Sequence, residues 1–145
     1  MKARIKWIEQ ASFVAESGSG HAVVMDGAPE HGGRNLGIRP MEAVLMGLGA
    51  CTAFDVVSIL KKSRQQVADC IVELEADRAE PVPKVFTRIR MVYRVSGTNL
   101  DASRVHRAVS LSAEKYCSAT AMLRDRVDIS HVVIIENEKE SKTRN

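Results

Sequence analysis

Residues 41–53 form an apolar segment in which Glu42 carries the only charged side chain. Pro40 precedes this segment, and proline suits the first turn of a helix because the N–H group that it lacks would have no partner there. The pattern predicts a helix that begins at Pro40 and ends near Lys62. A helix that is apolar on nearly every side must also be covered on nearly every side.

The length of the chain limits what can cover this helix. A chain of 145 residues corresponds to about one domain, and we interpret residues 1–145 as a single domain with about six strands in one modest sheet. Such a sheet covers only one face of the helix. The simplest cover for the other faces is a second copy of the chain, so the sequence predicts an intertwined homodimer with this helix at its centre.

The remaining segments predict an α+β fold in the order β-β-β-α-β-β-α-α-β. Alternating apolar and polar residues are typical of half-buried strands, whereas Asp101 is a good N-cap for a helix. We expect a mobile loop over the Gly-rich residues 27–38 and a frayed, charged tail over residues 136–145. The predicted strands are 2–9, 12–16, 21–25, 67–76, 85–95 and 129–135, and the two later helices are 101–115 and 118–126.

Charge and composition argue against several classes of partner. The 21 basic and 18 acidic residues are interspersed, and only 4% of residues are aromatic, so we expect no nucleic-acid partner. The apolar segment contains Glu42 and Asp55, which favours a buried helix over a membrane span. The N-terminal residues show no signal peptide. We therefore expect a cytoplasmic protein with no membrane partner, whose three cysteines are thiols.

Cys51 lies in the middle of the apolar helix. At about 100° per residue, Val44, Leu48 and Asp55 share its face, whereas Glu42 lies near the opposite side. Asp55 follows one turn later and can reach the sulfur. A carboxylate on an apolar helix needs a partner, for which an Arg from a neighbouring element is a candidate.

The other two cysteines have different settings. Cys117 falls between two predicted helices, where backbone N–H groups and the helix dipole would lower the pKa of its thiol. Cys70 shares the apolar face of a predicted strand and is interpreted as structural. For Cys51 and Cys117, packing as small core residues remains an alternative to chemistry.

Several other kinds of site find little support in the sequence. A Cys–His hydrolase has no local signature here. The cysteines lie too far apart in sequence for a compact zinc knuckle, and the histidines lack metal-ligand spacing, so we expect no metal. No phosphate loop, dinucleotide fingerprint or Cys-x-x-Cys pair is present, so we expect no cofactor. The four histidines are His21, His31, His106 and His131.

Two cysteine motifs resemble those of the OsmC/Ohr family, in particular its YhfA-like branch. They are Pro40-Met-Glu-Ala-Val-Leu-Met-Gly-Leu-Gly-Ala-Cys51 and Ala113-Glu-Lys-Tyr-Cys117-Ser. The resemblance also covers the N-terminal Met1-Lys-Ala-Arg-Ile-Lys-Trp7 and thus nearly the whole chain. It implies an OsmC-like fold, a domain-swapped homodimer whose central helices are enclosed by antiparallel sheets.

The resemblance also implies an activity. It suggests a thiol peroxidase that reduces organic hydroperoxides or hydrogen peroxide in defence against oxidative stress. By position, Cys51 would be the peroxidatic cysteine, which becomes a sulfenic acid. Cys117 would be the resolving cysteine, which condenses with it to a disulfide. The partners would be a hydroperoxide substrate and an external dithiol reductant.

The sequence departs from the family pattern at three points. The family's Glu directly after the proline is Met41 here, and Glu42 comes one residue later, rotated by about 100°. Ser118 replaces the proline that usually follows the second cysteine. The activating Arg cannot be aligned, and Arg34 and Arg39 are the loop candidates.

These departures leave an alternative function open. The chain could be a non-peroxidase OsmC-like dimer that binds a small apolar ligand near Val44, Leu48 and Asp55, or it could sense redox state.

Overall fold

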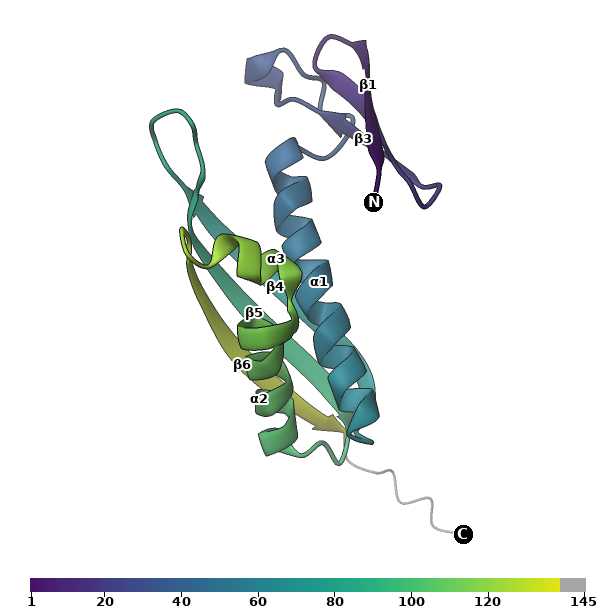
Figure 1. The fold of residues 1–145 in the computed structure, drawn as a ribbon, viewed down its shortest axis with the longest axis vertical. Coiled ribbons are helices and arrows are strands. Elements are labelled where there is room, and N and C mark those ends of the chain that lie inside the picture. The colour runs from purple at the N-terminus through teal and green to yellow at the C-terminus, as the bar shows by residue number, and fades with distance from the viewer. Residues whose placement is uncertain (139–145) are drawn as a thin grey trace. The chain divides into compact units, whose positions relative to one another are not determined.

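The computed structural model describes residues 1–138 of the chain (Figure 1). Its strands and helices follow the predicted order. The strands are β1 (Ala3–Glu9), β2 (Ser12–Ser17), β3 (Ala22–Asp26), β4 (Gln66–Arg78), β5 (Phe86–Thr98) and β6 (Asp128–Glu138), and the α-helices are α1 (Pro40–Lys62), α2 (Ala102–Leu111) and α3 (Ser118–Leu123). A 3₁₀ turn, η1 (Pro29–His31), and a π-helical turn, η2 (Ser112–Tyr116), complete the set.

The described chain contains two sheets, so the expectation of one sheet is wrong. It divides into two compact units, one formed by residues 1–46 and the other beginning at Gly47. The N-terminal unit holds the sheet β1-β2-β3, in which neighbouring strands are antiparallel. The C-terminal unit holds the sheet β4-β5-β6.

The C-terminal sheet is mixed, which corrects the expectation of purely antiparallel sheets. Strands β4 and β5 are antiparallel, whereas β5 and β6 run parallel. Two parallel neighbours need a crossover connection, which is usually helical. The segment with α2, η2 and α3 joins β5 to β6 and provides this crossover.

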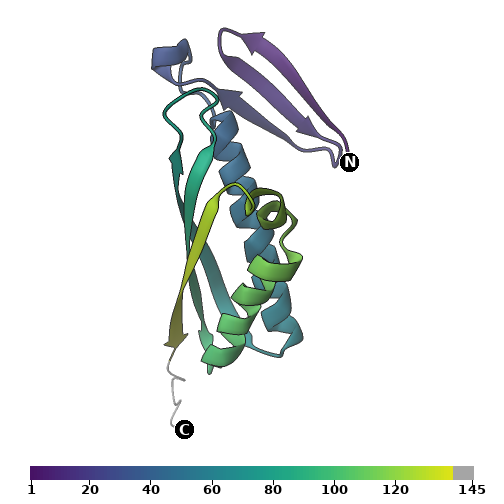
Figure 2. The same ribbon diagram turned by 60° about the vertical axis from the view of Figure 1, so that its left-hand side comes forward.

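Helices α1 and α2 lie side by side on one face of the C-terminal sheet (Figures 1 and 2). The buried side chains of the core come from α1, the central strand β5 and α2. At Gly49 a Cβ atom would lie 2.6 Å from Leu74 Cδ1, so the absence of a side chain allows β4 to approach α1 closely. The core includes Leu48, Val56 and Leu60 of α1, Ile89, Met91, Tyr93 and Val95 of β5, and Val105, Ala108 and Val109 of α2.

The end of α2 differs from the prediction, whereas its start agrees. Asp101 caps α2 as expected, since its carboxylate accepts the N–H groups of Ser103 at 2.9 Å and Arg104 at 3.3 Å. The predicted helix to residue 115 is interrupted, because α2 ends at Leu111 and the π-helical turn follows.

The Gly-rich loop over residues 27–38 is anchored by Asp26. The buried carboxylate accepts backbone N–H groups from Leu36 at 3.0 Å, Arg34 at 3.0 Å and Gly27 at 2.8 Å. The hydrogen bond from Leu36 has the largest effect on Asp26. Together with the bonds from Arg34 and Gly27 it keeps the pKa of Asp26 below its ordinary value, although burial raises that pKa.

The predicted charged tail begins later than expected. Strand β6 extends to Glu138, so residues 136–138 belong to the sheet. Residues 139–145 lie outside the described residues.

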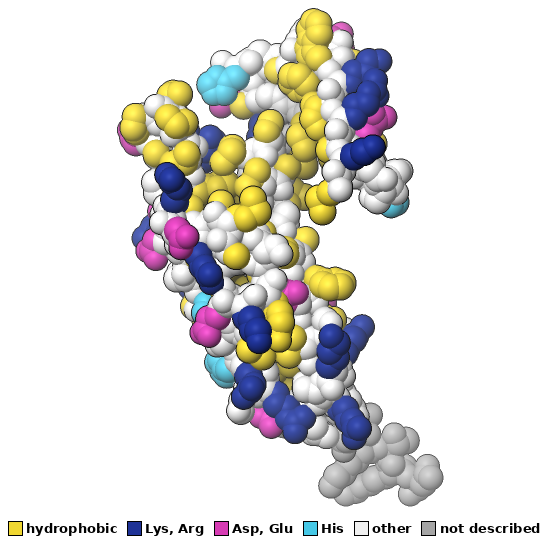
Figure 3. All heavy atoms as spheres, in the orientation of Figure 1, with side chains coloured by type: hydrophobic (Ala, Val, Ile, Leu, Met, Phe, Trp, Pro, Cys, Tyr) yellow, Lys and Arg dark blue, Asp and Glu magenta, His cyan; other side chains and the backbone are white. Residues whose placement is uncertain are grey.

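Large apolar side chains are exposed in each unit. In the N-terminal unit, Ile5 and Trp7 on one face of β1 are 59% and 62% exposed, and Figure 3 shows hydrophobic side chains gathered on this unit. In the C-terminal unit, Phe54 of α1 is 75% exposed. Helix α1 is long and apolar enough to cross a membrane, a test that the core helix of a soluble protein also passes.

Candidate functional site

The fold brings together two cysteines that are far apart in the sequence. Cys51 lies on α1, and Cys117 lies directly before α3. The Sγ atoms of Cys51 and Cys117 and a carboxylate oxygen of Asp55 all lie within 4.8 Å of one another. All three belong to the C-terminal unit, and we call them the dithiol–carboxylate cluster. Both cysteines are free thiols.

Asp55 reaches the cluster from α1, one helical turn after Cys51. The sequence predicted a partner for this carboxylate and suggested an Arg. Among the described residues of the C-terminal unit, however, Asp55 forms no ion pair, and the partner is a hydroxyl group. Ser112 Oγ, at the start of η2, donates a hydrogen bond of 3.1 Å to Asp55 Oδ2.

A chain of buried hydroxyl groups extends from Asp55 into the core. Thr52 Oγ1 lies 2.8 Å from Ser112 Oγ and 2.7 Å from the Tyr93 hydroxyl. Met91 Sδ, 3.7 Å from the Tyr93 hydroxyl, is an alternative acceptor for the Tyr93 hydrogen. Thr52, Ser112 and Tyr93 are all fully buried. Helix α1, strand β5 and η2 therefore meet through polar groups inside an otherwise apolar core.

The hydrogen bond from Ser112 to the Asp55 carboxylate fixes the direction of the other two. A carboxylate only accepts, and each hydroxyl group has a single hydrogen to donate. Ser112 gives its hydrogen to Asp55 and must accept from Thr52, which in turn must accept from Tyr93. Burial raises the pKa of Tyr93, so its hydroxyl keeps the hydrogen that this chain requires.

Cys117 is the more enclosed of the two thiols. It is 3% exposed, whereas Cys51 is partly exposed. As predicted, Cys117 lies at a helix N-terminus, where its Sγ accepts the Thr120 N–H at 3.4 Å. Its pKa, however, is raised rather than lowered. Burial is the main cause and outweighs the hydrogen bonds from Thr120, while the neighbouring Cys51 raises the pKa further.

Glu42 and the two candidate arginines belong to the N-terminal unit. The Glu42 carboxylate accepts the backbone N–H of Arg39 at 2.8 Å, as the third residue of a helix does in a capping box. The Arg39 guanidinium donates to Asn35 Oδ1 at 2.9 Å and to Gly37 O at 3.1 Å. Arg34 forms an ion pair with Glu9. Glu42 thus has a structural role in starting α1 that the sequence analysis did not identify.

The apolar residues predicted to bind a ligand have different exposures. Val44 is 46% exposed, whereas Leu48 is 1% exposed and contributes to the core rather than to an open cleft. Asp55 lines a hollow of about 550 Å³ in the C-terminal unit. The apolar side chains of this hollow come from Phe54, Ile59, Leu111 and Tyr116.

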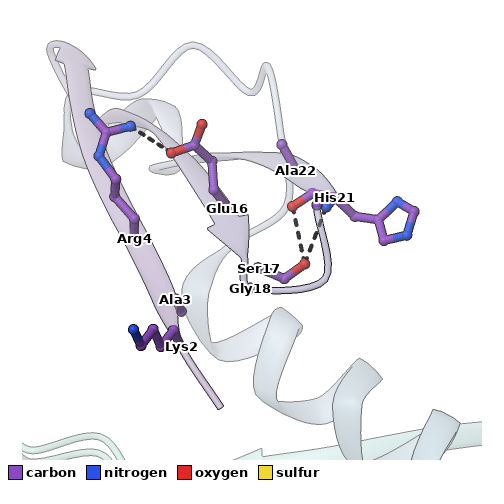
Figure 4. Close-up of a pocket in the computed structure, with 9 residues that line it drawn as sticks. Lys2, Ala3, Arg4, Glu16, Ser17, Gly18, His21 and Ala22 are labelled. Atoms are coloured by element: carbon purple, nitrogen blue, oxygen red, sulfur yellow. Dashed lines mark hydrogen bonds and ion pairs between the residues drawn. The ribbon is translucent and has the colours of Figure 1, made fainter.

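A second hollow, of about 480 Å³, lies in the N-terminal unit (Figure 4). Its polar groups bond to one another, because Arg4 pairs with Glu16 at 2.6 Å and the Ser17 hydroxyl donates to the His21 carbonyl at 3.3 Å. No cysteine lines this hollow. We therefore place the candidate site at the dithiol–carboxylate cluster.

Thr52, Tyr93 and Ser112 are the site residues that the sequence analysis missed. Their signal was a hydroxyl group at a position that the apolar pattern places in the core, because a buried hydroxyl requires a hydrogen-bond partner. Cys70, by contrast, lies where the sequence placed it, half-buried on β4 and separate from the cluster.

Known proteins share the fold and much of the sequence. Residues 32–132 match the family model described as "OsmC-like protein". Protein YhfA of Escherichia coli K12 is 49% identical over 134 residues, which cover 90% of this chain and 95% of that protein.

Solved structures extend this similarity. A hypothetical protein from Aquifex aeolicus VF5 has a TM-score of 0.83 at 29% identity, covering 95% of this chain and 97% of that one. The organic hydroperoxide resistance protein OhrB of Bacillus subtilis shares the fold, with a TM-score of 0.62 at 18% identity over 92% of this chain and 98% of that one. The resemblance found in the cysteine motifs is confirmed: the chain belongs to the OsmC-like protein family.

Proposed function

We propose that this protein is a thiol peroxidase that reduces organic hydroperoxides or hydrogen peroxide, with Cys51 as the peroxidatic and Cys117 as the resolving cysteine. The observation that carries the proposal is the pair of sulfur atoms within 4.8 Å of each other and of a carboxylate oxygen. The shared fold of the OhrB protein, named for organic hydroperoxide resistance, supports the same reaction class.

The different exposures of the two thiols support their roles. A peroxide from solution meets Cys51 first, because its side chain is partly exposed while Cys117 is buried. Burial raises the pKa of the Cys117 thiol, so this thiol keeps its proton until Cys51 has been oxidised. It becomes reactive when its neighbour has become an electrophilic sulfenic acid.

Asp55 is positioned to move the proton in the first step. The carboxylate accepts the Cys51 thiol proton, and the sulfur attacks the terminal peroxide oxygen while the O–O bond breaks. The leaving alkoxide then takes that proton from Asp55 and departs as an alcohol. The products are the Cys51 sulfenic acid and one alcohol, or one water when hydrogen peroxide is the substrate. The hydrogen bond from Ser112 holds the carboxylate oriented for this transfer.

The second step forms a disulfide, and an external reductant is needed to regenerate the two thiols. The Cys117 sulfur attacks the Cys51 sulfenic acid, which forms the disulfide and releases one water. An external dithiol then reduces the disulfide by exchange and is itself oxidised to a disulfide. We place this cycle in the cytoplasm, where thiol reductants keep cysteines reduced.

Steady-state turnover tests the proposal. Purified protein with an organic hydroperoxide and a dithiol should consume both in a 1:1 ratio, at a rate proportional to protein concentration. Loss of the dithiol and of the peroxide, each followed separately, measures that ratio. If peroxide disappears no faster than in buffer with the dithiol alone, the peroxidase proposal fails.

We further propose that the protein is a domain-swapped homodimer. The apolar face of β1, with Ile5 and Trp7, and the exposed Phe54 of α1 need a cover. Exposed patches of this kind mark interaction surfaces. Light scattering after size exclusion should give twice the 15.9 kDa chain mass. Replacing Trp7 with Glu should shift the protein toward the monomer, and a wild-type mass of one chain would contradict the proposal.

The hollow beside Asp55 favours a second candidate function. Its apolar walls suit a small apolar ligand, so the protein could be a binding or redox-sensing member of the family. A hydroperoxide with an apolar tail would also fit there. Two results together would favour the second candidate. Cys51 would stay reduced after a stoichiometric pulse of hydroperoxide, and the dimer would bind an apolar fluorescent probe at this hollow.

A further inference from the structure

We propose that Cys51, Asp55 and Cys117 together form a binding site for a thiophilic divalent cation, Zn²⁺ first among them. Soft thiolate ligands favour such cations over Mg²⁺ and Ca²⁺, which prefer oxygen ligands. Two thiolates and one carboxylate are a ligand set that Zn²⁺ accepts, with a fourth position left for water.

The geometry of the cluster suits a tetrahedral ion. Zn–S bonds of about 2.3 Å place two tetrahedral sulfur ligands about 3.8 Å apart. The three ligand atoms lie within 4.8 Å of one another. Side-chain shifts of about 1 Å or less would therefore bring all three to bonding distance. Binding Zn²⁺ displaces the thiol protons of Cys51 and Cys117.

Two of the three ligands are already oriented by hydrogen bonds. Ser112 Oγ donates to Asp55 Oδ2 at 3.1 Å, and the backbone N–H of Thr120 points at Cys117 Sγ at 3.4 Å. Such outer contacts fix ligand orientation and strengthen metal binding. The donors leave the other Asp55 oxygen and the remaining lone pairs of the sulfur free for an ion.

An ion can reach this cluster from solvent. Cys51 is partly exposed, and Asp55 opens onto the hollow of about 550 Å³ that Phe54 and Tyr116 also line. The expectation of no metal rested on the wide separation of the cysteines in the sequence. The fold removes that separation, because η2 and α3 carry Cys117 to α1.

The consequence for regulation rests on the proposed function. Bound Zn²⁺ occupies the Cys51 sulfur that would attack the peroxide, so bound zinc slows this attack. When oxidation does occur, two zinc-bound thiolates, one hydroperoxide and two protons give the disulfide, one alcohol, one water and free Zn²⁺. Two electrons pass from the sulfur pair to the peroxide.

Metal titration tests the site. Reduced, chelator-treated full-length protein is titrated with Zn²⁺ against a chromophoric zinc indicator. We expect one ion per chain. The dissociation constant should rise at least about 100-fold in Cys51→Ser and about 10-fold or more in Asp55→Asn. Cys70→Ser, which changes the half-buried cysteine outside the cluster, should bind as tightly as the wild type. Co²⁺ should give a thiolate charge-transfer band that Cys51→Ser loses.

The outcomes separate this inference from the proposed function. Failure to bind one ion, or equal affinity in the wild type and Cys51→Ser, would overturn the metal site. Equal Zn²⁺ affinity in the wild type and Asp55→Asn would show that Asp55 is not a ligand and would overturn the three-ligand site. Peroxide oxidation of the metal-free protein is measured separately with chelator present. A peroxide-inert protein that binds Zn²⁺ would reject the peroxidase alone, and an active protein without zinc affinity would reject the metal site alone.

Discussion

Replacing Cys51 with serine is expected to lower the rate of peroxide-dependent dithiol oxidation at least about 1,000-fold. In the proposed reaction Cys51 supplies the attacking sulfur, and an enzyme that loses its nucleophile keeps only a small fraction of its rate. The serine hydroxyl matches the thiol in shape but does not reduce a peroxide. The measurement is the initial rate of dithiol loss at fixed hydroperoxide concentration.

Two further variants serve as controls for this result. Cys70→Ser removes a half-buried thiol outside the cluster and should retain the wild-type rate. Cys117→Ser should still react once with peroxide but should accumulate the Cys51 sulfenic acid, which a dimedone-type reagent traps. A Cys51→Ser protein that keeps the full rate would show that Cys51 is not the peroxidatic residue.

The second large effect is expected at Thr52, where valine should destabilise the protein by about 2 kcal/mol. Valine has nearly the same shape but lacks the hydroxyl group that connects Tyr93 to Ser112 at 2.7 and 2.8 Å. Both partners stay buried and lose a hydrogen bond, which costs about 1–3 kcal/mol each. We take the lower end of this range, because Ser112 keeps its bond to Asp55 and Tyr93 can donate to Met91 Sδ instead. Thermal unfolding followed by circular dichroism should show a Tm lower by roughly 6 °C.

Thr87→Val provides the matched control, because it makes the same change at an exposed position on β5. Its Tm should stay near that of the wild type. Both proteins are compared at one protein concentration, since the stability of an oligomer depends on concentration. Equal Tm values for Thr52→Val and Thr87→Val would mean that the hydroxyl chain adds nothing to stability.

Local patterns were sufficient to predict most of the secondary structure. Pro40 begins α1, and Asp101 caps α2. The alternation over residues 85–95 predicts one face with Thr87, Ile89, Met91, Tyr93 and Val95, and all of these except the exposed Thr87 are buried. These signals work because a cap or an alternating strand depends on residues a few positions apart. The two cysteine motifs indicated the family to which the chain belongs.

Features that depend on distant pairs could not be predicted from local patterns. A strand shows the same alternation beside a parallel neighbour as beside an antiparallel one, so the alternation in β6 does not reveal its direction. The direction of β6 relative to β5 is set by the helical crossover that joins them. The hydroxyl group of Ser112 becomes the partner of Asp55 only after α2 and η2 place it beside α1. Burial decides the pKa of Cys117, whereas its position at a helix start predicted the opposite shift.

The pairing of Cys51 with Cys117 is the central claim, and it is tested most directly by mapping the oxidised peptides. Reduced protein receives one equivalent of hydroperoxide, is alkylated without reductant, and is digested for mass spectrometry. The account predicts a single disulfide-linked pair of peptides that contain Cys51 and Cys117, with Cys70 alkylated. Oxidised protein in which Cys51 and Cys117 are both alkylated, or in which Cys70 takes part in the disulfide, would contradict it.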